Sequence, residues 1–184
     1  MKSVLISIQP KWCELITSGK KTVEVRKTKP KIETPFKCYI YCTKGETIYH
    51  PRDIFGNESL NGKVIGEFVC NKIGTTSWIN SPDHPLWQDG FCEEICLTNR
   101  ELYDYSNGDT FYEWYISDLV IYDKPKELSE FGRECDYEKN CGDCPHLYVE
   151  NTPSCYETWC EVDGFIPLKR PPQSWCYVEE RSKQ

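Results

Sequence analysis

The chain has 184 residues and a formal net charge of −7, with 29 acidic and 22 basic side chains. This length is near the usual size of one domain and is enough to bury a sizeable core. The negative charge argues against duplex DNA as a partner, because nonspecific affinity for DNA comes from lysines and arginines that neutralise phosphates. No apolar run approaches the length of a bilayer span and no secretory signal is present, so we expect a soluble, cytoplasmic protein with no membrane partner.

The first 26 residues predict a strand, a short helix and a second strand. Residues 3–8 form an apolar run with strand character, and Pro10 suits the first turn of a helix, where its missing N–H has no partner anyway. Apolar residues then recur at helical spacing, and Gly19 can adopt the left-handed conformation that ends a helix. From residue 22 the pattern alternates, which predicts that a strand begins there.

A cation, an anion and a second cation fall within six positions at the start of this second strand: Lys21, Glu24 and Arg26. The two-residue period of a strand places Glu24 and Arg26 on the same face. Lys21 lies in the preceding turn and is close enough in sequence to reach the edge of that face. One interpretation is a compact functional cluster; the other is a solvated strand with a surface ion pair worth at most about 1 kcal/mol.

The cluster is part of a longer pattern over residues 7–26, S-I-Q-P-x-W-x-x-L-I-x-x-G-x-K-x-x-E-x-R. This pattern resembles the opening of ASCH domains, members of the PUA-like superfamily of small β-barrels linked to RNA and modified bases. The resemblance continues more loosely to about residue 123, and residues 171–180 look like the end of ASCH-type proteins often carried by phages and prophages. It implies one domain over residues 1–184 with an α+β fold, a small PUA-like mixed β-barrel of about five to six strands with flanking short helices and a Cys-rich insertion.

Positive charge is concentrated around the cluster. Residues 1–37 carry a net charge of +6, whereas the remainder of the chain carries −13. Such a local field favours an anionic ligand on one face, and a single-stranded nucleic acid or a nucleotide fits it better than a duplex. The alternative is a solvated basic strand and loop. The basic side chains concerned are Lys20, Lys21, Arg26, Lys27, Lys29, Lys31 and Lys37.

Residues 36–42 and 62–70 alternate in the manner of strands, and glycines inside the second run favour the bulges and coiling of a small barrel over an open sheet. Residues 74–91 predict a long irregular loop. The capping-box spacing of residues 98–101 predicts a helix that runs to about Tyr105.

Residues 114–122 are rich in aromatic and β-branched side chains and predict the strongest strand of the second half. In the ASCH family a strand at this place lines the ligand cavity. The resemblance therefore implies Tyr115 or Ser117 as wall residues, while packing in the core or on the surface is an equally good interpretation of each.

Twelve cysteines occur in the chain, and without a secretory signal we expect them to be reduced. Seven are dispersed through the predicted elements, where a free cysteine behaves as a small apolar residue. Five others crowd into the insertion, residues 133–162, together with His146. The C-x-x-C pair Cys141 and Cys144, followed by a second pair, Cys155 and Cys160, predicts a structural zinc site, with Cys135 or His146 as alternates. The alternative is a loose insertion without metal.

The cluster and the resemblance together predict a module that binds RNA, or a plain or modified nucleobase or nucleotide, in a PUA-like cavity. Lys21 and Arg26 would hold phosphate or a carbonyl oxygen, Glu24 would accept a hydrogen bond from a base amino group, and an aromatic ring would stack on the base. The expected partner is single-stranded RNA, a nucleotide or a modified nucleoside. The expected ligand-binding residues are Ser7, Gln9, Pro10, Trp12, Lys21, Glu24, Arg26 and Tyr115.

Two enzymatic interpretations of the same cluster stay open, with Lys21, Glu24 and Arg26 as catalytic residues. Some similar ASCH proteins deacetylate N4-acetylcytidine with a lysine and a threonine; Lys21 matches that lysine, but Glu24 occupies the threonine position. Thr22 is displaced by about 7 Å along the strand, so an amidohydrolase would need Glu24 as a general base on water. Nuclease activity of some ASCH proteins implies the other interpretation, a metal-free ribonuclease.

Overall fold

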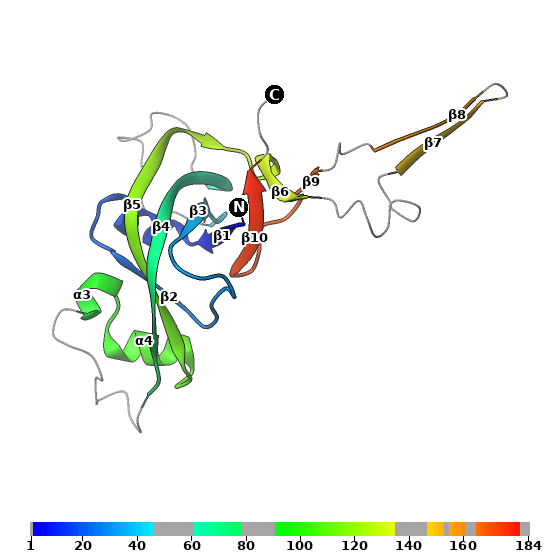
Figure 1. The fold of residues 1–184 in the computed structure, drawn as a ribbon. Coiled ribbons are helices and arrows are strands. Elements are labelled where there is room, and N and C mark those ends of the chain that lie inside the picture. The colour runs from blue at the N-terminus through cyan, green and yellow to red at the C-terminus, as the bar shows by residue number, and fades with distance from the viewer. Residues whose placement is uncertain are drawn as a thin grey trace.

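The computed structural model describes residues 2–45, 61–78, 91–134, 147–152, 155–160 and 165–180, and from residue 134 to residue 160 it describes the backbone alone. Eight strands form one sheet and two form a separate sheet (Figure 1). In chain order the elements are β1 (Ser3–Ile8), α1 (Pro10–Thr17), β2 (Val23–Arg26), β3 (Phe36–Cys42), β4 (Lys63–Thr76), α3 (Phe91–Ile95), α4 (Asn99–Ser106), β5 (Phe111–Lys126), the 3₁₀ helix η1 (Leu128–Glu130), β6 (Phe131–Glu134), β7 (Leu147–Thr152), β8 (Cys155–Cys160), β9 (Phe165–Pro167) and β10 (Trp175–Glu180).

The predicted strand, helix and strand of the first 26 residues are confirmed as β1, α1 and β2. Helix α1 begins at Pro10, as predicted. Gly19 follows the helix with a φ of +73°, a left-handed conformation that glycine adopts without strain, and its N–H donates to the carbonyl of Ile16 at 2.9 Å. This turn sets where β2 starts and therefore which face of the sheet its charged residues occupy.

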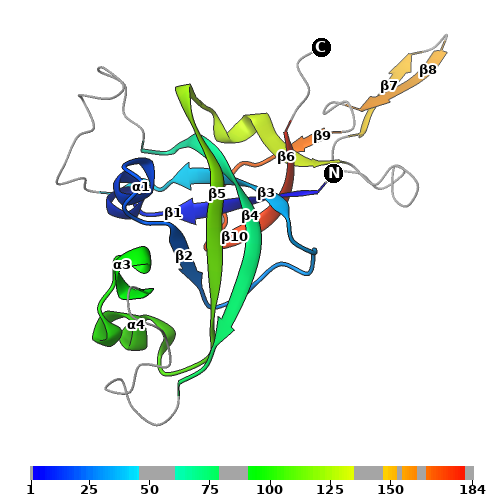
Figure 2. The same cartoon turned by 60° about the vertical axis from the view of Figure 1, so that its left-hand side comes forward.

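The large sheet is mixed. Strand β1 lies between β3, to which it is parallel, and β10, to which it is antiparallel. Strands β4 and β5 form a long antiparallel pair with several register shifts, and β2 pairs with β5 at one edge of the sheet (Figure 2). One of the irregularities in β5 is Asp118, whose φ is +47°.

The prediction of a closed barrel is wrong. The observed strand order is β2-β5-β4-β3-β1-β10-β6-β9. No pairing within the described strands joins the β2 edge to the β9 edge, so this sheet is open, and it has eight strands rather than five to six. The added strands β6 and β9 have only four and three residues, too few for a two-residue period to be recognised in the sequence. The α+β character of the prediction is confirmed.

The remaining predicted elements are largely confirmed. Strand 36–42 is β3, strand 62–70 is the first half of β4, and strand 114–122 is the middle of β5. Helix α4 follows Thr98, which forms the predicted capping box with Glu101. The predicted loop over residues 74–91 is shorter at its start, because β4 continues to Thr76; residues 79–90 lie outside the described part.

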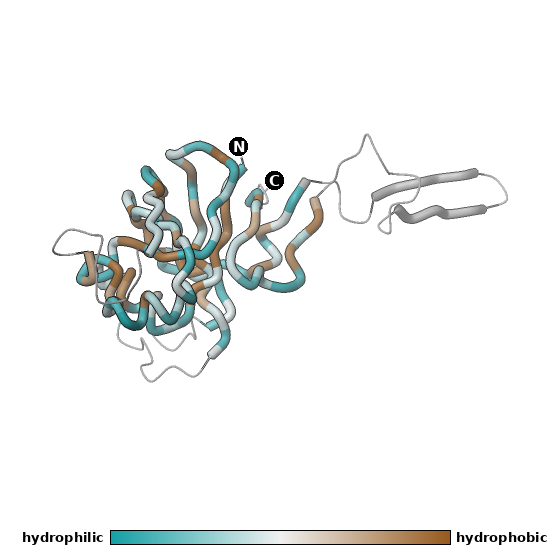
Figure 3. Tube along the Cα trace, turned by 90° about the horizontal axis from the view of Figure 1, so that it is seen from below, coloured by the Kyte–Doolittle hydropathy of each residue, from teal (hydrophilic) through white to brown (hydrophobic). Residues whose placement is uncertain are grey.

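The hydrophobic core of the described residues consists of three clusters, and hydrophobic residues run through the middle of the body (Figure 3). Val23 and Val25 of β2 pack with residues of α3 and α4, so the apolar face of β2 is covered by helices. Trp114 of β5 is fully buried in the cluster that also contains residues of β1, α1 and β3. Four of the dispersed cysteines are buried as predicted for packing residues, namely Cys13, Cys38, Cys42 and Cys70. Among the described residues, no helix has the length and apolar character needed to cross a membrane.

Candidate functional site

A cavity of about 1050 Å³ opens beside β2. Its walls come from residues 7–9, 11 and 12 at the junction of β1 and α1, from β2 with the two residues after it, from α4, and from residues 171–174 before β10. Small-molecule pockets in proteins usually measure about 300–1,000 Å³, so this cavity is large enough for a nucleotide. Four segments that are distant in the sequence therefore meet at one site.

The predicted cluster forms the inner wall of this cavity. Glu24 Oε1 lies 3.1 Å from Arg26 Nη2, and Glu24 Oε2 lies 3.5 Å from Lys21 Nζ. Lys21, Glu24 and Arg26 are only 3%, 6% and 8% exposed. The interpretation as a solvated strand with a surface ion pair is therefore wrong, and the structure brings all three charges together in a buried site.

Backbone carbonyls hold both cations of the cluster. Lys21 Nζ donates to the carbonyl oxygen of Ile95 at 2.6 Å, and Arg26 Nη2 donates to that of Ser7 at 2.7 Å. Burial lowers the pKa of Lys21 below its usual value, and the neighbouring Glu24 carboxylate opposes this shift. The two cations are thus fixed in position by the end of α3 and by β1 before any ligand arrives.

Two buried atoms of the cluster have no hydrogen bond within the described residues: Glu24 Oε2 and Arg26 Nε. A buried polar group without a partner costs about 1–3 kcal/mol, and more when the group is charged. Both residues line the cavity. Among the described residues, Glu24 Oε2 faces the Lys21 ammonium at 3.5 Å without a hydrogen bond, and Arg26 Nε has no hydrogen bond, so both atoms retain hydrogen-bonding capacity for a molecule bound at this wall.

Aromatic rings stand at the rim of the cavity. The Trp12 ring has Lys11 Nζ at 4.1 Å and Lys21 Nζ at 5.3 Å from its centroid. Tyr105 of α4 donates its hydroxyl to the carbonyl oxygen of Val25 at 3.2 Å and is 38% exposed. Both rings line the cavity, so flat surfaces are available next to the buried charges.

Comparison with known families agrees with this arrangement. A model of the ASCH domain matches residues 6–149. The chain belongs to the ASCH domain family. ASCH domains are PUA-like and are associated with RNA binding or with hydrolase activity. The comparison with curated proteins returned no match.

Solved ASCH structures from Zymomonas mobilis are similar to this chain in fold. A point mutant of ZmASCH has a TM-score of 0.50 and 24% sequence identity, over 70% of this chain and 77% of that one. The unmutated ASCH crystal structure has a TM-score of 0.49 and 24% identity, over 68% of this chain and 73% of that one. At this level of identity the similarity concerns the fold alone.

Most of the predicted binding residues of this ASCH domain meet at the cavity. Besides the cluster, Ser7, Gln9 and Trp12 line it. The Ser7 hydroxyl already has a partner within the fold, because its Oγ donates to the carbonyl oxygen of Pro172 at 2.7 Å. The side chain of Gln9, in contrast, makes no capping hydrogen bond to α1. Pro10 is not among the lining residues; it occupies the first position of α1 and turns the chain there.

Tyr115 lies outside the cavity wall, as does Ser117, so the structure removes both from the predicted lining. Tyr115 is the register partner of Val23, whose side chain faces α3 and α4, while the partner of Glu24 is Trp114. The Tyr115 hydroxyl donates to Glu113 Oε2 at 3.2 Å, and Ser117 Oγ donates to the carbonyl oxygen of Val69. No residue of β5 lines the cavity, and Tyr115 instead packs against the cluster of apolar residues that contains Val23 and Val25.

Several lining residues had no predicted role. Tyr105 ends the helix predicted from its capping box, and residues 171–174 belong to the closing motif that resembles ASCH-type proteins. Both signals were present in the sequence, but neither indicated a position near β2. Of the seven predicted basic residues, Lys21, Arg26 and Lys27 line the cavity, whereas Lys37 pairs with Glu67 elsewhere on the sheet.

The predicted zinc ligands fall mostly outside the described residues. This applies to Cys135, Cys141, Cys144 and His146. Cys155 and Cys160 are the first and last residues of β8, where only the backbone is described. The zinc site therefore stays a prediction.

Proposed function

We propose that this ASCH domain binds a nucleobase, as part of single-stranded RNA or of a free nucleotide or modified nucleoside, against the Glu24 face of the cavity. The observation that carries the proposal is the pair of buried atoms, Glu24 Oε2 and Arg26 Nε, that have no hydrogen bond among the described residues and belong to residues of the cavity wall. A fold that needed these charges only for its own stability would be expected to satisfy them internally.

The two atoms that lack a hydrogen bond match the edge of a base in their donor and acceptor character. Glu24 Oε2 accepts a hydrogen bond from an amino group or ring N–H, while Arg26 Nε donates to a ring nitrogen or carbonyl oxygen. Such a donor next to an acceptor is present on the pairing edges of the nucleobases, which proteins read when a base is unpaired. Trp12 and Tyr105 then supply rings at the rim on which the base can stack.

The sequence predicted that Lys21 and Arg26 hold the phosphate of the nucleotide, and we propose a different place for it. Lys21 Nζ and Arg26 Nη2 already bind backbone carbonyls and Glu24. Lys11 and Lys27 are exposed, and both line the cavity near its aromatic rings. We assign the phosphate to these two rim lysines and the reading of the base to the buried residues.

Hydrolysis is the second candidate, and the buried Lys21 beside Glu24 is the observation in its favour. Thr22, the alternative nucleophile, is exposed, precedes β2 and does not line the cavity. An amidohydrolase would therefore use water activated by Glu24, with Lys21 or Arg26 stabilising the oxyanion. A ribonuclease would use Lys21, Glu24 and Arg26 around a phosphate of RNA, although the cavity as described contains no histidine.

The test is a binding titration with a matched pair of variants. Glu24→Gln removes the carboxylate from the cavity, whereas Glu113→Gln changes an equally buried carboxylate that binds Thr76 and Tyr115 away from the cavity. The probes are the four ribonucleoside monophosphates, N4-acetylcytidine and a single-stranded RNA octamer. Thermal unfolding establishes that both variants are folded.

We expect Glu24→Gln to weaken binding at least about tenfold, because a hydrogen bond to a charged group contributes about 1.5–3 kcal/mol, and we expect Glu113→Gln to bind as the wild type does. Equal binding by Glu24→Gln and the wild type would refute the proposal. Mass spectrometry of the same mixtures reports products, and turnover that is lost in Glu24→Gln would replace the binding module with a hydrolase and identify the bond.

We also propose that the Cys-rich insertion binds zinc through Cys141, Cys144, Cys155 and Cys160, with Cys135 or His146 able to replace one of them. Four thiolates in two pairs match the tetrahedral coordination that structural zinc requires. Protein purified without chelator is expected to hold about one zinc per chain. The metal should be lost in the double variant Cys141→Ser/Cys144→Ser and retained in Cys13→Ser, which alters a buried cysteine of α1.

A further inference from the structure

A lysine occurs at every second position in residues 27–31, Lys-Thr-Lys-Pro-Lys, directly after β2. Each lysine lies beside a different tyrosine. Lys27 Nζ is 5.4 Å from the ring centroid of Tyr105, and Lys29 Nζ is 5.2 Å from that of Tyr112. The backbone N–H of Lys31 donates to the hydroxyl of Tyr177 at 2.7 Å. Each exposed lysine of this segment therefore has beside it a tyrosine from another element, α4, β5 or β10.

This segment is attached to β10, which lies 147 residues further along the chain. Trp175 Nε1 donates to Thr28 Oγ1 at 3.0 Å, and the ring of Trp175 lies 5.5 Å from that of Tyr177. Lys2 Nζ lies 6.0 Å from the centroid of the Tyr177 ring. Figure 1 shows the chain between β2 and β3 passing the lower end of β10. The two segments thus form one surface, which we call the lysine-aromatic track: Lys2, Lys27, Lys29, Lys31, Trp175 and Tyr177.

The track is continuous with the cavity. Lys27 and Thr28 line the cavity, and so do residues 171–174, which lead directly into Trp175. Helix α4 also contributes two exposed acidic side chains to the wall, Glu101 and Asp104, and Asp104 is paired with Arg100. Residues 27–31 carry three positive charges and no negative charge, so they supply the attraction for a polyanion that leaves the cavity.

The exposure of the track fits a binding surface. Its four lysines are exposed, Tyr177 is 36% exposed and Trp175 is half-buried. Glu33 is the only acidic residue from residue 25 to residue 35. A positive groove with aromatic rings at intervals is the arrangement by which proteins hold single-stranded nucleic acids without reading their sequence.

We propose that the lysine-aromatic track binds the nucleotides that adjoin the base in the cavity, so that the partner is a single-stranded nucleic acid of several nucleotides. This inference rests on the proposed function of the cavity and adds a second subsite to it. The lysines contact phosphates, and the exposed faces of Tyr177 and Trp175 stack on bases outside the cavity.

The experiment compares a ribonucleoside monophosphate with a labelled single-stranded RNA octamer of mixed sequence, each titrated at several salt concentrations. The variant Lys29→Ala/Lys31→Ala removes two track lysines that do not line the cavity. Its control is Lys72→Ala/Lys124→Ala, which removes the same charge from exposed positions on β4 and β5. Tyr177→Ala tests stacking in the same assay.

We expect the octamer to bind more tightly than the monophosphate, and each phosphate contact to contribute about 0.7 to the slope of log affinity against log salt. Lys29→Ala/Lys31→Ala should lower that slope by about 1.4 and leave monophosphate binding unchanged. Tyr177→Ala should weaken octamer binding roughly tenfold, the smaller end of the range for loss of one stacked base.

Two results would overturn the inference without touching the cavity: an octamer that binds no better than the monophosphate, or an unchanged salt slope in Lys29→Ala/Lys31→Ala. A slope lowered equally by Lys72→Ala/Lys124→Ala would also overturn it, because the effect would then come from net charge. If the wild type binds neither probe, the proposed function of the cavity fails and the track fails with it.

Discussion

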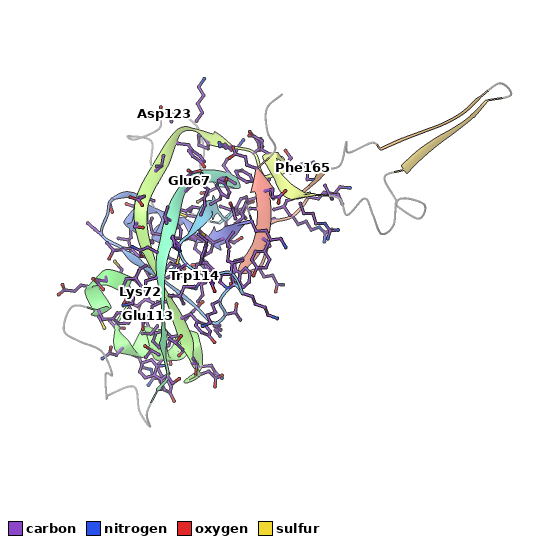
Figure 4. All side chains as sticks on the ribbon, in the orientation of Figure 1. Glu67, Lys72, Glu113, Trp114, Asp123 and Phe165 are labelled. Atoms are coloured by element: carbon purple, nitrogen blue, oxygen red, sulfur yellow. The ribbon has the colours of Figure 1, made fainter. Side chains whose placement is uncertain are left out.

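Two buried glutamates on adjacent strands are satisfied in opposite ways. Glu24 of β2 and Glu113 of β5 are 6% and 8% exposed. They lie on opposite faces, because Glu24 pairs with Trp114 and Glu113 pairs with Val25. Figure 4 labels Glu113 and Trp114 as neighbours on the lower half of β5. The same residue type at the same depth therefore occupies two different environments, one strand apart.

Neutral hydroxyl groups satisfy Glu113. Thr76 Oγ1 donates to its Oε1 at 2.5 Å, and the Tyr115 hydroxyl donates to its Oε2 at 3.2 Å. Its carboxylate also fills the space beside Gly74, where an added Cβ would lie 2.2 Å from Oε2. Both oxygens thus have donors within the fold, and no part of Glu113 is left for a ligand.

Glu24 has cations on both sides instead, and one of its oxygens has no hydrogen bond among the described residues. A buried carboxylate usually needs several donors to offset its lost hydration. The contrast with Glu113 teaches that burial alone does not identify a functional carboxylate. A carboxylate that is incompletely satisfied beside a cavity is the better candidate, because the missing partner can then be a ligand.

The largest effect that separates the two glutamates should be on stability. Glu24→Ala leaves the Lys21 and Arg26 cations buried without their anion, which is expected to lower the free energy of unfolding by about 3–5 kcal/mol. Glu113→Ala leaves two hydroxyl groups without an acceptor, at a cost of about 1–3 kcal/mol. Urea unfolding of both variants measures the difference. Equal losses would show that the two carboxylates are structurally equivalent and would break the comparison.

A second prediction disturbs the Glu113 side alone. Gly74→Ala places a methyl group against Glu113 Oε2 and should cost about 1–3 kcal/mol, the usual range for overpacking. In a Glu113→Ala background the same substitution should cost much less, since the clashing carboxylate is absent. Ligand binding at the Glu24 face should not change in either background. Additive costs would mean that Gly74 is constrained by something other than Glu113.

Local signals predicted the first part of the candidate site. Pro10, Gly19 and the alternation after residue 22 depend on chain geometry between near neighbours, and they placed Glu24 and Arg26 on one face correctly. The burial of the cluster was not predicted from these signals, because its cover comes from α4 and from residues 171–174. Charged residues at alternating positions of a strand predict a solvent-exposed face, and only the positions of distant segments in the fold can show that the face is buried.

The errors on β5 and in the sheet have the same origin. Excluding Tyr115 from the cavity wall required the register between β2 and β5, and β5 contains register shifts that interrupt a simple two-residue period. The link between Thr28 and Trp175 spans 147 residues. Strand pairing at such separations depends on the whole topology, so neither the open sheet nor the lysine-aromatic track was predictable from the sequence pattern.

The smallest predicted effect concerns alkaline pH, where the stability contributions of Lys21 and Tyr115 should change with pH in opposite directions. Burial lowers the pKa of Lys21 below its usual 10.5, whereas burial, aided by Glu113, raises the pKa of Tyr115 above its usual 10.0. Between its lowered and usual values, Lys21 holds fewer protons in the folded chain than in the unfolded chain, so its contribution to stability rises with pH. Tyr115 holds more protons when folded above pH 10.0, so its contribution falls as pH rises through its folded value.

Difference curves isolate these two groups from the other titrating residues. The free energy of unfolding of the wild type minus that of Lys21→Met should increase with pH as pH approaches 10.5. The corresponding difference for Tyr115→Phe should decrease above pH 10.0. Opposite signs are expected because burial favours the neutral form of both side chains, which lowers the pKa of an ammonium and raises the pKa of a phenol. Curves of the same sign would show that burial is not the dominant cause of one of the two shifts, which would set the partner of Glu24 apart from the partner of Glu113.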